Sequence, residues 1–259
     1  MEYANHFLTN VIFRIDFVSE KEELKNNLDR GIKEACVKKF PIQESIEIEQ
    51  KEVQVQQSED GGKTITQSTE KTTEWHFWGK NREKKLVITK NSMFIDFTKY
   101  KSFIEFKADF NVACKALQEV YPDININRIG LRYIDQIKIN DMSTVKTWKT
   151  YWNKYISSEL VNALQFPDED KAISRHMTSV EMNYGECMLR FQYGMFNNDY
   201  PAPNKRKEFV IDTDVYSLGL FEMGEVEDQM DLFHEKAEAW FEKSIKEALR
   251  KKMGVTING

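Results

Sequence analysis

The sequence has few of the features that mark secreted and membrane proteins. It has 259 residues and three cysteines, which lie far apart and cannot all pair with one another, so we expect no disulfide framework. Cys36 and Cys114 fall on the apolar faces of expected helices, and we interpret them and Cys187 as reduced core residues. No apolar run approaches the ~20 residues that cross a bilayer, and the N-terminus lacks a charged and then apolar leader. We therefore expect a cytoplasmic protein without a membrane attachment.

Signatures of metal, phosphate and nucleophilic chemistry are also missing. The four histidines are not spaced near one another, or near cysteine or aspartate, in the way that metal ligands are. The glycines are isolated and form neither a Walker-type loop nor a dinucleotide fingerprint. No serine lies in a nucleophile elbow, and no cysteine lies beside an activating histidine in a known motif. We expect no metal and no cofactor, and the spacing identifies no catalytic residue.

What the sequence does contain is enough apolar material for a folded core. Hydrophobic residues make up 41% of the chain and aromatic residues 12%, and a chain of this length buries ~70–75% of its unfolded surface. The net charge of -5 at pH 7 argues against strong sequence-independent binding of nucleic acid, which depends on neutralising phosphates. The composition predicts a folded, soluble protein of two modules of ordinary domain size.

The strongest organisation in the sequence is an internal repeat, whose second copy begins near residue 126. Residues 11–17 alternate apolar and polar side chains as a half-buried strand does, and residues 129–135 align with them, Phe13 over Leu131 and Arg14 over Arg132. An amphipathic helix follows each of these strands. Its apolar positions are Leu24, Leu28, Ile32, Ala35 and Cys36 in the first copy and Trp148, Tyr151, Trp152 and Tyr155 in the second.

Each copy then continues with strands, a basic loop and a long closing helix. Residues 76–79 match residues 192–194, and residues 84–88 match residues 207–211. The closing helices have the clearest helical periodicity in the chain, which predicts two core helices. Their apolar stripes are Phe103, Phe106, Phe110, Ala113, Cys114, Leu117 and Tyr121, and Met230, Phe233, Ala237, Trp240, Phe241, Ala248 and Leu249.

These matches predict an α+β fold. We expect a tandem pseudo-repeat of β-α-β-β-β(-β)-α modules, with antiparallel sheets that are each packed against a long helix. The first module covers residues 1–124 and the second covers residues 125–259, with a long C-terminal helix. The joint lies at Tyr121-Pro122-Asp123, where a proline follows the end of a helix. A polar stretch near 51–73 is expected to be a long hairpin that turns at Asp60-Gly61, or else a disordered linker.

Arginines and aspartates on expected strands are the best candidates for a ligand site. By the period of two, Arg128 and Arg132 share a strand face with Gly130 between them, and such a pair beside open glycine backbone suits an anion. Asp212 and Asp214 also share a face, where they could bind a cation or act as an acid/base pair. Arg14 occupies the matching position in the first copy. The alternative interpretation is structural, with these charges paired across strands or solvated.

The basic loop of each copy is a second candidate, for nucleic acid. If the copies are related by a pseudo-twofold axis, both loops project at equivalent places and could straddle a polyanion. Charged hairpin tips also arise because they keep a protein soluble and protect sheet edges. The residues are Lys80, Arg82, Lys84 and Lys85 in the first copy and Lys205, Arg206 and Lys207 in the second.

Three segments carry a resemblance to a known group of proteins. Residues 127–137 (NRIGLRYIDQI), residues 210–214 (VIDTD) and the helix from Leu232 to Glu242 resemble an uncharacterised, sporadically distributed prokaryotic family with R-I-G-L-R-Y-I-N-x-I, L-D-I-D and L-H-x6-F-E motifs. Asp135 stands where that family usually has asparagine, and Val210 and Thr213 depart from the acidic motif. The resemblance implies an accessory gene of mobile or defence-related cassettes, without an established activity.

Three functional hypotheses follow. The first is a non-enzymatic binding or regulatory module, defence-related or antitoxin-like, that recognises a protein encoded nearby. The second is a binder of nucleic acid or a nucleotide through the basic loops and strand arginines. The third is a hydrolase or transferase with a site near Arg132, Asp212 and Asp214. A concave cluster of these residues would favour the third hypothesis, and a long basic groove would favour the second. A flat apolar patch with neither feature would favour the first. Homo-oligomerisation stays open.

Overall fold

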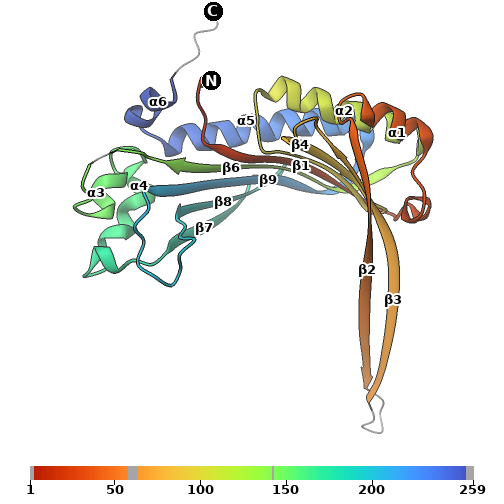
Figure 1. Cartoon of the computed structure of the whole chain (residues 1–259), viewed down its shortest axis with the longest axis horizontal. Coiled ribbons are helices and arrows are strands. Elements are labelled where there is room, and N and C mark those ends of the chain that lie inside the picture. The colour runs from red at the N-terminus through yellow and green to blue at the C-terminus, as the bar shows by residue number, and fades with distance from the viewer. Residues whose placement is uncertain (1–2, 58–62, 142, 255–259) are drawn as a thin grey trace, which may run out of the picture.

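In the described part of the chain, all strands belong to one antiparallel sheet. The computed structural model describes residues 3–57, 63–141 and 143–254. Nine strands pair in the order β2-β3-β4-β5-β1-β6-β9-β8-β7 (Figure 1). The predicted α+β class with antiparallel pairing is confirmed, and the strands of both halves form one continuous sheet. The strands are β1 (Leu8–Phe17), β2 (Ile42–Gln57), β3 (Lys63–Trp78), β4 (Lys84–Ile88), β5 (Ser92–Phe97), β6 (Asn125–Lys138), β7 (His176–Asn183), β8 (Met188–Met195) and β9 (Glu208–Glu222).

Strands β1 and β6 join the two halves of the sheet. Val11, Phe13 and Ile15 alternate with polar residues along β1 and are completely buried. Strand β6 pairs with β1 so that Phe13 lies opposite Leu131. Because this pairing continues the sheet, the segments 1–124 and 125–259 contribute to the same sheet and the same hydrophobic core.

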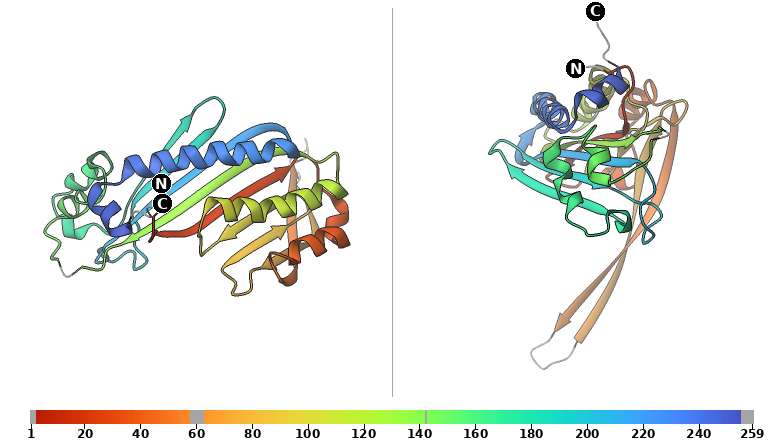
Figure 2. Two further views of the ribbon diagram at one scale, coloured as in Figure 1. Left: turned by 90° about the horizontal axis from the view of Figure 1, so that it is seen from above. Right: turned by 90° about the vertical axis from the view of Figure 1, so that its left-hand side faces the viewer.

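Helices α2 and α5 lie over one face of the sheet, which we call the helix-covered face (Figures 1 and 2). The ring of Phe106 in α2 packs edge-on against Phe97 of β5, with centroids 4.9 Å apart. The ring of Trp240 in α5 lies 5.0 Å from that of Phe191 in β8. The α-helices are α1 (Arg30–Val37), α2 (Phe103–Val120), α3 (Trp148–Trp152), α4 (Ser158–Val161), α5 (Val226–Ser244) and α6 (Glu247–Met253), and the short 3-10 helices are Glu22–Lys25, Asn162–Gln165, Asp170–Ala172 and Met223–Glu225.

Three helices are shorter than their apolar patterns predict, and one of them is α3, which ends at Trp152 although its pattern extends to Tyr155. Leu24 lies in the separate 3-10 helix, and α1 begins after Asp29, whose carboxylate accepts a hydrogen bond of 2.6 Å from the backbone N–H of Gly31. An aspartate in this position satisfies a free N–H of the first turn and starts the helix there. The closing stripe that was expected to reach Leu249 is interrupted at Ile245, whose extended backbone (φ -111°, ψ 155°) separates α5 from α6.

Strands β2 and β3 form a hairpin that projects from the sheet on the side away from α2 and α5 (Figure 1 and Figure 2, right). The two strands pair from Ile42 opposite Trp78 to Gln57 opposite Lys63, so the polar stretch near 51–73 belongs to a hairpin and not to a linker. The turn predicted at Asp60-Gly61 lies outside the described residues.

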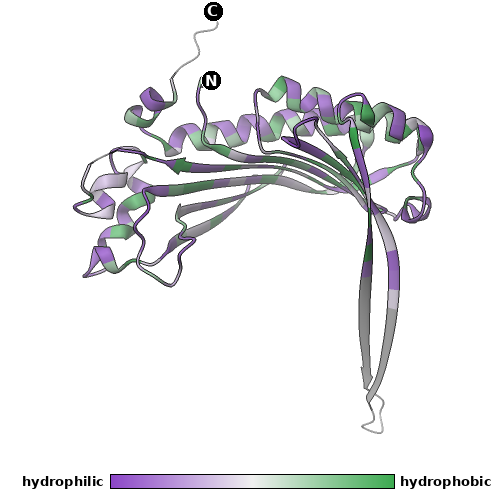
Figure 3. Cartoon of the chain, viewed as in Figure 1, coloured by the Kyte–Doolittle hydropathy of each residue, from purple (hydrophilic) through white to green (hydrophobic). Residues whose placement is uncertain are grey.

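The face of the sheet opposite α2 and α5 is the open face. Alternation places Arg14 of β1 and Arg132 of β6 on it, and their side chains are 44% and 41% exposed. The β2–β3 hairpin at one end, and α3 and α4 at the other, extend toward this side (Figure 1). Apolar residues are concentrated along the central strands, whereas the helices alternate apolar and hydrophilic residues (Figure 3). The open face is thus a polar surface framed at both ends.

Candidate functional site

The candidate ligand residues all lie on the open face. Strand pairing brings Arg128 opposite Asp16, and Arg132 and Arg190 opposite Asp214, so side chains from β1, β6, β8 and β9 form one cluster. We call it the arginine–aspartate cluster. Its members are Arg14, Asp16, Arg128, Arg132, Arg190, Asp212 and Asp214.

Arg132 is bound by Asp212. Its Nε and Nη2 donate hydrogen bonds of 2.8 and 2.6 Å to the two carboxylate oxygens of Asp212. This two-point contact is the geometry that a guanidinium prefers for a carboxylate, and it raises the pKa of Arg132. The side chain of Asp212 is only 11% exposed. Arg132 is therefore paired with an aspartate of the neighbouring strand, which is the structural interpretation of these charges.

Arg14 and Arg128 share Asp16. Nε of Arg14 lies 2.6 Å from one carboxylate oxygen of Asp16, and Nη1 of Arg128 lies 3.9 Å from the other. The guanidinium of Arg128 lies over the ring of Tyr216, 5.2 Å from its centroid. It also covers Gly130, where an added Cβ would approach its terminal nitrogens to 3.2 Å. The glycine therefore makes room for the arginine side chain and does not offer open backbone to an anion.

Asp214 lies among three arginines. Burial raises the pKa of its carboxyl group, and the charges of Arg128, Arg132 and Arg190 oppose that rise. Arg190 of β8 was missed in the sequence because only the pairing of β8 with β9 brings it opposite Asp214. It also forms an ion pair of 2.9 Å with Glu181. Positive and negative charges are therefore balanced on the open face.

The first basic loop is mostly held by internal contacts. Lys84 contacts Asp109 of α2, whose side chain is 1% exposed. Arg82 pairs with Glu44 and lies over the ring of Trp78. Lys85 approaches Asp96 at 3.8 Å. Among the described residues, Lys80 forms no ion pair.

In the second basic loop, too, most of the cations are paired within the fold. Arg206 pairs with Asp199 at 3.1 Å. Nζ of Lys207 donates to the carboxylate of Asp141 at 2.6 Å and to its backbone carbonyl at 2.7 Å, and this contact lowers the pKa of Asp141. Lys205 is exposed and has no ion pair within the described part of the chain. Most cations of both loops therefore stabilise the fold locally.

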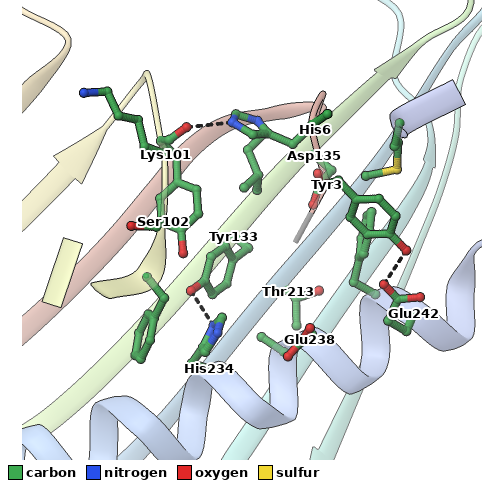
Figure 4. Close-up of a pocket in the computed structure, with 17 residues that line it drawn as sticks. Tyr3, His6, Lys101, Ser102, Tyr133, Asp135, Thr213, His234, Glu238 and Glu242 are labelled. Atoms are coloured by element: carbon green, nitrogen blue, oxygen red, sulfur yellow. Dashed lines mark hydrogen bonds between the residues drawn. The ribbon is translucent and has the colours of Figure 1, made fainter. Parts of the chain in front are cut away.

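A pocket on the helix-covered face was not predicted from the sequence (Figure 4). It has a volume of about 400 Å³ and lies between the sheet, the start of α2 and the middle of α5. Residues near both ends of the chain cover it. Two backbone hydrogen bonds hold these segments together, from Ala4 N to Gly254 O at 2.9 Å and from Asn5 N to Met253 O at 2.8 Å. Phe241, which was expected in the core, lines this pocket and is only partly buried.

Asp135 of β6 is the most unusual side chain of the pocket. It is 5% exposed and lies on the helix-covered face in line with the apolar residues Leu131 and Ile137. Burial raises the pKa of its carboxyl group to about 8, and nearby Asp212 adds to the shift. Among the described residues, no side chain donates a hydrogen bond to this carboxyl group and none forms an ion pair with it.

Tyr133 and His234 form a neutral pair in the same pocket. The Tyr133 hydroxyl lies 2.9 Å from Nδ1 of His234, and the imidazole stacks on Phe103 with centroids 3.8 Å apart. Burial lowers the pKa of His234 to about 4 and raises that of Tyr133. At the rim, Glu242 accepts hydrogen bonds from the Tyr3 hydroxyl at 2.6 Å and from Arg250 at 2.9 Å.

Comparisons with known proteins give no assignment. No protein-family model matches this chain, and no curated protein is significantly similar to it. Within the described ranges, no group of histidine, cysteine, aspartate and glutamate side chains is arranged to hold a metal ion. None of the described helices combines the length and the apolar character that crossing a bilayer requires.

Proposed function

We propose that the protein is a non-enzymatic binding module whose open face docks a partner protein. The observation that carries this proposal is the composition of that face. Phe94 and Tyr216 lie partly exposed beside Arg14 and Arg128 of the cluster, and Trp78 lies partly exposed on the same face beside Arg82. Arginine, tryptophan and tyrosine are the residues that contribute most to protein–protein interfaces. We propose that the partner is encoded beside this protein in an accessory gene cassette.

The charge balance of the open face favours a protein over a polyanion. Each arginine of the cluster has a carboxylate neighbour, so the surface offers alternating signs and not the positive stripe that phosphates require. A protein partner carries both signs and can match such a pattern. The two basic loops add little to a nucleic-acid interface because most of their cations are engaged internally.

The same geometry supports binding over hydrolysis or group transfer. Arg132 and Asp212 satisfy each other in a two-point contact, and a side chain so engaged is a poor general acid or base. The cluster lies on the open sheet face, where water has access. A catalytic site usually places such groups in a recess that excludes water.

We also propose that the two halves arose by duplication. From the centre outward, the first half contributes β1-β5-β4-β3-β2 and the second contributes β6-β9-β8-β7. In each half the first strand is central and the last strand lies next to it. Phe13 and Leu131, which the sequence alignment equates, lie directly opposite each other. A pseudo-twofold axis that passes between these two residues would generate this arrangement.

Site-specific photo-crosslinking tests the docking proposal. A benzophenone amino acid replaces Ile12 or Phe94 on the open face, or Ile104 on α2, which is 77% exposed. We expect the open-face probes to crosslink one and the same protein in the native cells, and the α2 probe not to crosslink it. Crosslinks from Ile104 with none from the open face, or no crosslinked protein at all, would contradict the proposal.

A further inference from the structure

The pocket on the helix-covered face lies on the side of the sheet away from the proposed docking surface. It lies on the other side of the sheet and has a volume of about 400 Å³, which is within the range of pockets that hold small molecules. Its walls come from β6, β9, α2 and α5, and residues near the two chain ends cover it (Figure 4). Such a position suits a small ligand held between the sheet and the two helices.

The carboxyl group of Asp135 has no partner among the described residues around this half-open pocket. Buried polar groups in proteins almost always have a hydrogen-bond partner, because an unpaired one costs a large part of its hydration free energy. Asp135 is 5% exposed and lines the pocket, yet within the described residues nothing donates to its carboxyl group. A ligand that supplies a positive charge or a donor would satisfy it.

The remaining walls fit the body of an organic cation. Tyr100, Phe103, Tyr133 and Phe241 present aromatic surface to the pocket. The faces of aromatic rings attract cations, and such contacts are strongest where water is excluded. The Tyr133 hydroxyl lies 2.9 Å from Nδ1 of His234, so its ring, more than its hydroxyl group, is presented to a ligand.

Carboxyl groups outnumber cationic side chains among the described residues that line the pocket. Glu238 and Glu242 line it together with Asp135. The side chain of Lys101 is 79% exposed, and Figure 4 shows that it points away from the pocket. Nε2 of His6 lies at the rim, 2.6 Å from the backbone carbonyl of Tyr100. Within the described residues that line the pocket, no cationic side chain is seen to point into it.

We propose that this pocket binds a small organic ammonium ion, with Asp135 as its counter-ion and the aromatic side chains around its body. The ligand class follows from the unpartnered carboxyl group, the aromatic walls and the volume of the pocket. The proposal is independent of partner docking, because its residues lie on the opposite face of the sheet.

Matched pairs of probes separate charge from shape. Choline and 3,3-dimethylbutan-1-ol differ by replacement of the cationic nitrogen with carbon, and tyramine and tyrosol differ by replacement of the ammonium with a hydroxyl group. Binding of each is measured to the full chain by saturation-transfer NMR and by calorimetry. We expect at least one cationic probe to bind at least tenfold more tightly than its neutral counterpart. The proposal is overturned if no cationic probe exceeds its counterpart.

Two substitutions of similar shape locate the interaction. Asp135→Asn keeps the size of the side chain and removes its charge, so we expect the preference for the cation to fall at least tenfold while the neutral probe changes less than twofold. Asp214→Asn is the matched control, because this carboxyl group is also largely buried but lies on the open face. A cation preference that survives in Asp135→Asn, or is lost equally in Asp214→Asn, would contradict the assignment. If Asp135→Asn does not fold, the matched probes decide the question on the unmodified protein.

Proton release gives an independent readout. A cation favours the ionised form of Asp135, so binding at pH 7 should release close to one proton, measured from calorimetry in buffers of different ionisation enthalpy. His234 is uncharged at this pH because burial lowers its pKa to about 4, and the pKa of Tyr133 is raised. Binding without proton release would overturn the counter-ion role. The other titratable groups near the pocket are the N-terminal amino group, which helps to lower the pKa of His234, and Tyr3, His6, Tyr100, Lys101, Asp212, Glu238, Glu242 and Arg250.

Discussion

At the scale of single residues, alternation along a strand separates two kinds of aspartate. Asp212 of β9 falls on the open face, where Arg132 binds it in a two-point contact. Asp135 of β6 falls on the helix-covered face among apolar residues and has no partner in the described structure. The sequence shows both residues on strands, and the period of two places Asp135 in line with Ile129, Leu131 and Tyr133. The position of Asp135 on this apolar face of the strand is the feature of the sequence that indicates a buried carboxyl group.

Asp135→Asn should stabilise the protein more as the pH rises. The folded state keeps the proton of Asp135 up to a pKa of about 8, whereas the unfolded chain loses it near pH ~4. The folded state therefore binds more protons in this window, so wild-type stability falls as the pH rises from ~4 to ~8. The amide of asparagine does not titrate, and the stability gained by the variant should increase by on the order of 4 kcal/mol across this range.

Urea unfolding of both proteins at several pH values between 4 and 9 measures this difference. A difference in unfolding free energy that stays constant over the whole range would show that Asp135 is ionised in the folded protein. The offset from burying an amide is the same at every pH and does not affect the comparison.

At the scale of elements, the contact between Lys84 and Asp109 links β4 to α2. The sequence places Lys84 in a basic loop, but the pairing of β4 turns this side chain toward the helix-covered face, where it is 14% exposed. Asp109 is 1% exposed, and Lys39 approaches its other oxygen at 3.2 Å. A cation in a basic loop can thus have a structural role that spacing alone does not reveal.

Lys84→Met should lower the unfolding free energy by ~2–4 kcal/mol, because it leaves a buried carboxylate with only one exposed lysine nearby. Lys80→Met is the matched control in the same loop, and its exposed side chain should contribute less than ~0.5 kcal/mol. Thermal unfolding of the two variants checks this. Equal melting temperatures would show that the contact contributes nothing to stability.

The sequence predicts helices and strands well where the periodicity of apolar residues determines them. It predicts the ends of a helix poorly where the backbone conformation of one residue starts or stops the helix. The strand around Phe13, the strand around Leu131 and the helix from Phe103 follow directly from their periodicity. The first helix is shortened by the cap at Asp29, and the last is divided at Ile245. Each interruption depends on the backbone conformation at a single residue. The helical spacing of the apolar residues continues across that residue, so the sequence pattern does not reveal where the helix ends.

At the scale of the whole molecule, the sequence does not say how its halves combine. The strand pattern is the same whether the halves form separate sheets or share one, and the pairing of β1 with β6 joins them. The pocket could not be predicted because its lining extends from Tyr3 to Met253 and comes together only when the sheet, α2 and α5 assemble. The arginine–aspartate cluster was partly predicted, because four of its strand positions share a face by alternation.

The framed open face is the feature that the proposed function depends on. It presents arginines and aromatic rings between the β2–β3 hairpin and the end of the sheet near α3 and α4 (Figure 1). The side chains of Arg14 and Arg190 are each 44% exposed, so they can contact a partner without unfolding the sheet. Exposed arginines contribute to the rate and specificity of docking through their charge.

The most direct measurement is the affinity of the crosslinked partner for a charge-reversed open face. We expect Arg14→Glu combined with Arg190→Glu to weaken binding by at least tenfold in calorimetry, with the melting temperature within a few degrees of wild type, because half-exposed ion pairs contribute little to stability. Arg30→Glu is the control, an 89% exposed arginine on α1, and it should leave the affinity unchanged. An unchanged affinity in the double variant, or an equal loss in Arg30→Glu, would contradict docking on the open face.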